Sequence, residues 1–256
     1  MKRNTDYKNA ALAALKGNWG KAVLAAVIYM AVMYIAIGPF TFNTIKMQNY
    51  ARENMPQVSS RAGIGAAMRE AMEASIALSQ DTEYIAMQTK ANRSMGLYYL
   101  LLFLVVMPLS VGLLNAFLKL LNQGDSEVPS NMYQIAKKNY WHKVWGMFLM
   151  TIFITLWSFL FVIPGIVKMF SYSMTPYILE ENPELSANEA IDRSRAMMKG
   201  HKFDLFWLIL SFIGWMILCI FTAGIGYIWL MPYMETSVAS FYEDVKADYE
   251  VNGGLI

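Results

Sequence analysis

Between Phe203 and Met234 the chain carries a single charged residue, Asp204. A helix of about 20 apolar residues is long enough to cross the hydrocarbon layer of a bilayer, which is about 30 Å thick. The composition points the same way: 56% of the residues are hydrophobic and 16% are charged, whereas soluble domains carry about 25% charged residues. The sequence therefore predicts an all-α fold, a polytopic transmembrane helical bundle.

The basic residues predict the orientation of this bundle, because Lys and Arg concentrate in cytoplasmic loops. They cluster in residues 1–21, 119–143 and 181–202. All three clusters fall on one side if the chain turns at tight outer hairpins near Pro164 and Gly224. This arrangement gives about six spans in three helical hairpins, with both termini cytoplasmic, and leaves open whether 165–180 and 225–242 span fully or are re-entrant. The expected spans are 20–45, 97–121, 144–163, 165–180, 203–222 and 225–242.

Residues 1–256 are expected to form a single membrane domain. Residues 46–96 are too polar for a span and too long for a tight loop, so they are expected to form an extracytoplasmic helical insertion between spans 1 and 2. A helix is expected from about Gly65 to Lys90. The methionines of this segment allow soft-metal capture or plain helix packing, and packing is the preferred interpretation.

Three segments share one layout, which we call an elbow: a short amphipathic helix, a Lys, a turn, and an aromatic residue before the next span. The elbows are residues 11–19, 132–141 and 190–201. Ser130 and Ser186 are expected to cap two of their helices, and Ser186 with Glu189 has the spacing of a capping box. An amphipathic helix in the headgroup region brings its cations to anionic lipid. The expected headgroup contacts are Lys16, Trp19, Lys138, Trp141, Lys143, Arg193, Arg195, Lys199, His201 and Lys202.

Several short motifs resemble those of a bacterial integral membrane family, domain of unknown function 975. The resemblance is dense over about 145–245 and at the first elbow. It implies a multi-pass protein of the bacterial inner membrane, and it supplies no catalytic residues because the family has no established activity. The motifs are Lys16-Gly17-Asn18-Trp19-Gly20, Ile163-Pro164-Gly165-Ile166, Ser171-Tyr172-Ser173-Met174-Thr175-Pro176-Tyr177, Asn182-Pro183-Glu184-Leu185-Ser186, Met197-Met198-Lys199-Gly200-His201-Lys202, Leu210-Ser211-Phe212-Ile213-Gly214-Trp215, Pro232-Tyr233 and Phe241-Tyr242-Glu243.

No motif in the sequence indicates catalysis or a bound metal. The two histidines, His142 and His201, have no His or Cys neighbour at ligand spacing, and Cys219 is the single cysteine. We therefore expect no catalytic residue, no metal and no cofactor. A net charge of +2 is too small to indicate a nucleic-acid partner.

Polar residues within the expected spans are the best functional candidates, because each is costly in lipid. Glu235 is expected near the midplane, at the depth of Ser211, Thr155, Tyr172 and Thr175. This polar layer has two interpretations: the lining of a substrate or ion path, or hydrogen bonding that holds the bundle together. Helix breaks are expected at Pro164, Gly165, Pro176, Gly224 and Pro232.

The expected function is non-enzymatic: a membrane protein that organises or assists envelope components, its amphipathic helices contacting anionic headgroups. The alternative is a small permease or lipid-handling transporter that uses the polar layer. The expected partners are membrane lipids, with a second copy of the chain or another envelope protein also possible.

Overall fold

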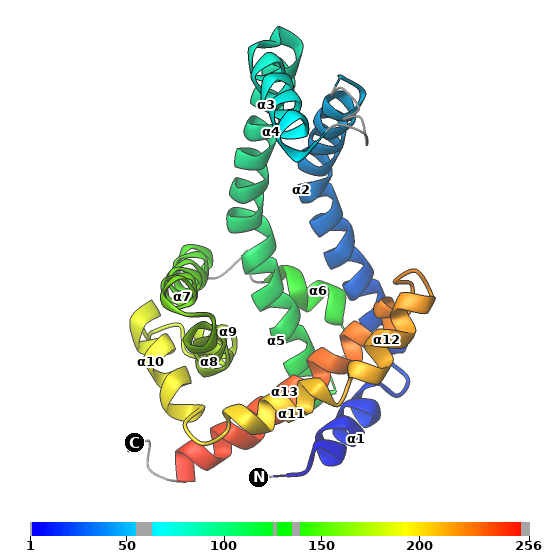
Figure 1. Cartoon of the computed structure of the whole chain (residues 1–256). Coiled ribbons are helices and arrows are strands. Elements are labelled where there is room, and N and C mark those ends of the chain that lie inside the picture. The colour runs from blue at the N-terminus through cyan, green and yellow to red at the C-terminus, as the bar shows by residue number, and fades with distance from the viewer. Residues whose placement is uncertain (1, 55–62, 125–126, 135–138, 252–256) are drawn as a thin grey trace. The chain divides into compact units, whose positions relative to one another are not determined.

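A computed structural model describes residues 2–54, 63–124, 127–134 and 139–251. Every regular element in these ranges is a helix (Figure 1), which confirms the all-α prediction. The contacts divide the chain into two units. We call Val32–Leu102 the insertion unit, and Met1–Ala31 together with Phe103–Ile256 the core unit.

The core unit is built from short helices around a buried centre. Leu102–Val106, a π-helical turn, begins at the unit boundary and leads into α5. The helices are α1 (Asn4–Leu15), the start of α2 (Trp19–Asn54), α5 (Met107–Gln123), α6 (Val128–Tyr133), α7 (Tyr140–Leu160), α8 (Val162–Tyr172), α9 (Thr175–Glu181), α10 (Ala187–Met197), α11 (Lys202–Leu210), α12 (Ile213–Phe221) and α13 (Tyr227–Val251).

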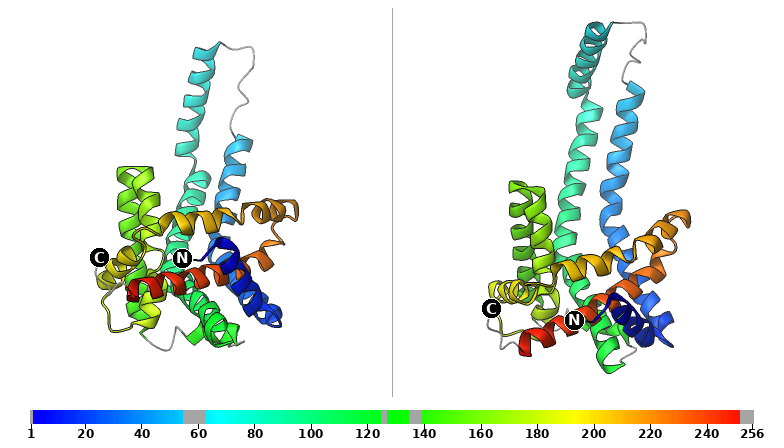
Figure 2. Two further views of the ribbon diagram at one scale, coloured as in Figure 1. Left: turned by 90° about the horizontal axis from the view of Figure 1, so that it is seen from below. Right: turned by 60° about the horizontal axis from the view of Figure 1, so that its bottom comes forward.

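Helix α1 packs against α13 (Figure 2). It buries Tyr7, Ala11 and Leu15, which are spaced four residues apart and so lie on one helix face. The Tyr7 hydroxyl donates a hydrogen bond of 2.6 Å to Asp244 Oδ2. Burial and this hydrogen bond raise the pKa of Tyr7. Burial alone would raise the pKa of Asp244, but the hydrogen bonds from Tyr7 and from the Lys2 N–H outweigh it and keep that pKa low. The apolar face of this elbow helix is thus covered by protein.

Four helical stretches of the described chain are long and apolar enough to cross a membrane, judged by length and composition: Trp19–Asn54, Thr82–Gln123, Tyr140–Leu160 and Lys202–Phe221. Between 17% and 33% of each apolar window is buried within the protein. Most of this apolar surface therefore needs an apolar environment outside the chain.

Expected helix breaks at Pro164, Pro176 and Gly224 lie at or close to helix ends, whereas Gly165 lies inside α8. Helix α7 ends at Leu160 and α8 begins at Val162, so the chain turns just before Pro164. Pro176 lies in the first turn of α9, where its missing N–H removes no helical hydrogen bond. Gly224 has φ +86° and its N–H donates to Cys219 O over 2.8 Å, which closes the turn after α12.

Pro232 also lies inside a continuous helix, α13. The break expected there is wrong. Pro232 and its neighbour Met231 are buried in the core unit, and this packing keeps the helix continuous although the proline supplies no backbone donor.

The three elbows each contain a residue with positive φ shortly before the next helix. Gly17 (φ +83°) precedes α2, Asn139 (φ +53°) precedes α7 and Gly200 (φ +91°) precedes α11. Left-handed backbone at a helix end reverses the chain tightly and is favourable for Gly and tolerated by Asn. The capping box of Ser186 and Glu189 is present as expected, whereas Ser130 lies inside α6, which is capped at Glu127.

The insertion unit contains the remainder of α2, α3 (Ile64–Gln80) and α4 (Thr82–Leu101). The single helix expected from Gly65 to Lys90 is broken at Asp81. The Asp81 carboxylate accepts hydrogen bonds from the N–H groups of Glu83 and Tyr84, 2.7 and 2.9 Å long, and one from the Tyr50 hydroxyl. Aspartate is a favoured N-cap residue, so it begins a new helix here.

Candidate functional site

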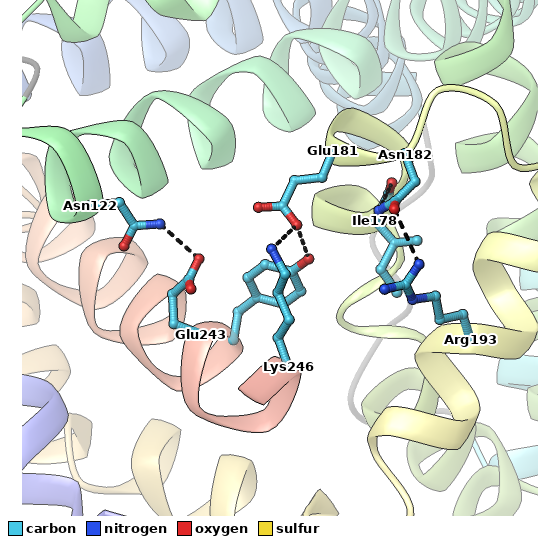
Figure 3. Close-up of polar contacts among 8 residues, drawn as sticks. Asn122, Ile178, Glu181, Asn182, Arg193, Glu243 and Lys246 are labelled. Atoms are coloured by element: carbon cyan, nitrogen blue, oxygen red, sulfur yellow. Dashed lines mark hydrogen bonds and ion pairs between the residues drawn. The ribbon is translucent and has the colours of Figure 1, made fainter. Parts of the chain in front are cut away.

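Helix α9 lies at the centre of a polar network in the core unit (Figure 3). Glu181, at its end, accepts a hydrogen bond from the Tyr242 hydroxyl at 2.5 Å and pairs with Lys246 Nζ at 2.7 Å. Both partners are on α13. The Tyr242 ring also stacks on Tyr177 of α9, with centroids 4.6 Å apart. These contacts fix the end of α9 against α13.

The same network extends to α5 and α10. Asn122 Nδ2 of α5 donates to Glu243 Oε1 over 2.8 Å. Asn182 Oδ1, just after α9, accepts a hydrogen bond of 3.1 Å from Arg193 of α10. A network that joins four helices through side chains specifies their arrangement.

A second polar contact lies on the adjacent residue, Glu180. Its Oε1 accepts a hydrogen bond of 3.1 Å from Asn115 of α5, and its Oε2 forms an ion pair with Lys143 of α7. The Lys143 side chain is only 3% exposed. A cavity of about 240 Å³ opens beside this contact, lined by Asn115, Leu118, Lys119, Asn122, Gln123, Glu180 and Glu181.

The residues of the expected polar layer lie in different environments. Glu235 is half-buried in α13. Tyr172 and Thr175 are buried. The Thr175 and Tyr177 hydroxyls are both buried without a hydrogen-bond partner among the described residues. The buried polar groups of Tyr172, Thr175 and Tyr177 therefore lie at the end of α8 and in α9.

Two residues of the expected layer have other surroundings. Thr155 is exposed on α7. Ser211 is exposed where α11 ends, and its carbonyl accepts a hydrogen bond of 2.9 Å from Lys8 Nζ of α1. Ser211 and Phe212 separate α11 from α12.

The expected headgroup contacts divide into exposed and buried residues. Lys16, Trp141, Arg195 and Lys199 are exposed, and Trp19, Arg193, His201 and Lys202 are half-buried. Lys143 is buried in its ion pair with Glu180 and so does not reach the surface. Lys138 lies outside the described residues. His201 pairs with Asp204 of its own helix turn and with Asp248 of α13, at 3.5 and 3.2 Å.

Sequence reasoning missed Asn115, Glu180, Glu181 and Tyr242. The one available signal was polar residues at the ends of, or inside, otherwise apolar stretches, such as Asn115 within α5. Their partners are 37 to 65 residues away in the sequence. Within the described part of the chain, no three His, Cys, Asp or Glu side chains gather in a way that could hold a metal ion.

Residues 1–249 match the family described as Protein of unknown function (DUF975). Comparison with curated proteins gave no match. Comparison with solved structures gave none either.

Proposed function

Since the chain belongs to the DUF975 family of proteins of unknown function, we propose that it is a multi-pass membrane protein that organises or assists other envelope components without catalysing a reaction. The observation that carries this proposal is the set of four long apolar helical stretches with mostly exposed apolar surface. Bacterial inner membrane and anionic lipid are the expected surroundings, with a second copy or another envelope protein as the protein partner.

The polar contacts around α9 support a structural role for the buried polar groups. Glu180 and Glu181 are each engaged by side chains from other helices. Carboxylates held in this way position helices relative to one another. The basic turns, in contrast, leave Lys16 and Lys199 at the surface, where they would meet anionic headgroups.

A small permease is the second candidate, and a specific observation favours it. The Thr175 and Tyr177 hydroxyls are buried without hydrogen-bond partners among the described residues. Unsatisfied buried polar groups are costly, and a bound polar substrate would satisfy them.

Substituting Glu235→Gln separates the two candidates, because it keeps the shape of the side chain and removes its charge. The organising role predicts a lower melting temperature in detergent, by a few degrees, with any growth phenotype following protein abundance. A folded variant of wild-type melting temperature that loses a substrate-dependent phenotype would contradict the organising role and establish the permease.

The six-span topology requires both hairpin tips to reach the outer surface. Helix α8 forms one arm of the hairpin near Pro164 and has 11 residues, and α12 forms one arm of the hairpin at Gly224 and has nine. These two helices are about 16 and 14 Å long, roughly half the hydrocarbon thickness. In a Cys219→Ser background, an Ile225→Cys variant is expected to react with an impermeant maleimide added outside intact cells, and Lys199→Cys only after lysis. Ser194 is fully buried and does not suit such labelling. If Ile225→Cys reacts from neither side, the hairpin is re-entrant and the six-span topology is wrong.

A further inference from the structure

Lys202 lines two separate hollows of the core unit. The first, of about 650 Å³, is lined by Leu185, Glu189, Asp192, Arg193, Arg195, Ala196, Lys199, Lys202 and Tyr249. The second, of about 490 Å³, is lined by Ile166, Val167, Phe170, Gly200, Lys202, Phe203 and Phe206. We call the first the basic cavity and the second the apolar groove. A charged hollow that shares a lining residue with an apolar one suits an amphiphile, which has a charged and an apolar part.

The basic cavity has cations in excess. Arg193, Arg195, Lys199 and Lys202 face two acids, Glu189 and Asp192. Both acids already have partners. Asp192 pairs with Arg195 at 3.0 Å. Glu189 is held in the capping box, where the hydrogen bonds with Ser186 keep the pKa of its carboxyl below the ordinary value.

The remaining cations of the basic cavity are available to an anion. Lys199 and Lys202 form no ion pair within residues 2–54, 63–124, 127–134 and 139–251. Arg193 donates one hydrogen bond to Asn182, and its Nε is buried with no hydrogen-bond partner among the same residues. A guanidinium and ammonium groups together match the oxygens of a phosphodiester.

The apolar groove is formed where α8 and α11 pack together. Phe170 and Phe206 meet edge to face, with ring centroids 6.0 Å apart, and they form part of the groove lining. Val167 and Phe203, also in the lining, are 45% and 75% exposed. Gly200 and Lys202 complete the groove lining, and Lys202 lines the basic cavity as well.

We propose that this combined site binds one anionic phospholipid, with its phosphate at Lys199 and Lys202 and an acyl chain in the apolar groove. The site deepens the proposed function, and rests on it, because it requires the chain to lie in a membrane. A zwitterionic lipid such as phosphatidylcholine brings its own cation next to Arg193 and Arg195, so the site prefers phosphatidylglycerol, which has none.

The charge requirement is tested on the full-length protein by native mass spectrometry with phosphatidylglycerol in an uncharged detergent. The double variant Lys199→Gln/Lys202→Gln is expected to bind the lipid about thirtyfold more weakly than wild type. Arg69→Gln/Lys90→Gln removes the same charge from exposed positions of α3 and α4 and is expected to bind like wild type. Equal losses in the two double variants would show a non-specific charge effect and overturn the site.

The acyl requirement separates a lipid from a free phosphate. Val167→Trp fills the apolar groove at a half-exposed position and leaves every charge in place, and Ile217→Trp, at a position 49% exposed on α12, is its control. We expect Val167→Trp to weaken phosphatidylglycerol binding and to leave the binding of soluble glycerol phosphate unchanged. If Val167→Trp binds the lipid like wild type, or if phosphatidylcholine binds as tightly as phosphatidylglycerol, the lipid site is wrong.

Extraction of membranes with alkaline carbonate distinguishes failure of this site from failure of the proposed function. A wild-type protein that stays in the membrane but shows no preference for phosphatidylglycerol overturns the site alone. A protein released by carbonate overturns the membrane location, and both proposals fail with it.

Discussion

Replacing Lys143 by methionine is expected to lower the free energy of unfolding by about 3–5 kcal/mol, the usual cost of breaking a buried ion pair. The Lys143 and Glu180 side chains are 3% and 20% exposed. Without the ammonium group, the Glu180 carboxylate keeps only the hydrogen bond from Asn115. An uncompensated charge in these surroundings is the main part of the expected cost.

Thermal unfolding in detergent measures this effect, and a drop in melting temperature of roughly 10 °C is expected for a chain of this size. The double variant Lys143→Met/Glu180→Leu removes both charges and is expected to recover most of the lost stability. Lys90→Met, at an exposed position of α4, controls for the loss of a lysine. A Lys143→Met protein as stable as Lys90→Met would show that the ion pair contributes nothing to the free energy of unfolding.

Local sequence signals predicted much of the backbone. The charge-free stretch after Asp204 belongs to α11 and α12, the turn at Gly224 has the left-handed backbone that glycine favours, and the Ser186 capping box begins α10. Each of these features depends on residues within a few positions of one another. Such features can be inferred from one sequence because the physics that produces them is local.

Tertiary contacts account for the sequence predictions that were wrong. Lys143 was expected at the headgroups because it follows Trp141 at the start of a span. Its side chain is instead buried, because it forms an ion pair with Glu180 on α9. Pro232 was expected to break a helix, yet packing in the core unit keeps α13 continuous. Neither partner nor packing can be seen in the neighbouring sequence.

The elbow helices show the same limit in a different way. Their periodicity indicates an apolar face, and the sequence alone suggested that lipid covers it. In α1 this face packs on α13, and in α10 the buried residues Ala190, Ile191 and Met197 face the protein core. Lipid contact at the elbows therefore depends on the cations of the turns. For this reason the basic cavity at Lys199 and Lys202 is a more specific candidate for a lipid site than the apolar faces of the elbow helices.

The Gly165→Ala substitution is expected to destabilise the fold although alanine is the better helix former by about 1 kcal/mol. A Cβ at this position of α8 would lie 2.7 Å from the Cα of Ser158 on α7. The backbones of the two arms would have to move apart, since no side-chain rotation relieves a clash with a Cα atom. Overpacking of this kind costs about 1–3 kcal/mol, and the added helix propensity offsets only part of it.

Gly214→Ala in α12 is the matched control for this substitution. A Cβ there meets no atom within 4 Å, so the same change is expected to leave the melting temperature unchanged or to raise it slightly. The difference between the two variants then isolates the close approach of α7 and α8 from helix propensity. Because this approach sets how tightly the α7–α8 hairpin closes, Gly165→Ala is also expected to increase proteolysis near Phe161. Equal melting temperatures for the two alanine variants would mean that α7 and α8 do not pack as closely as the structure shows.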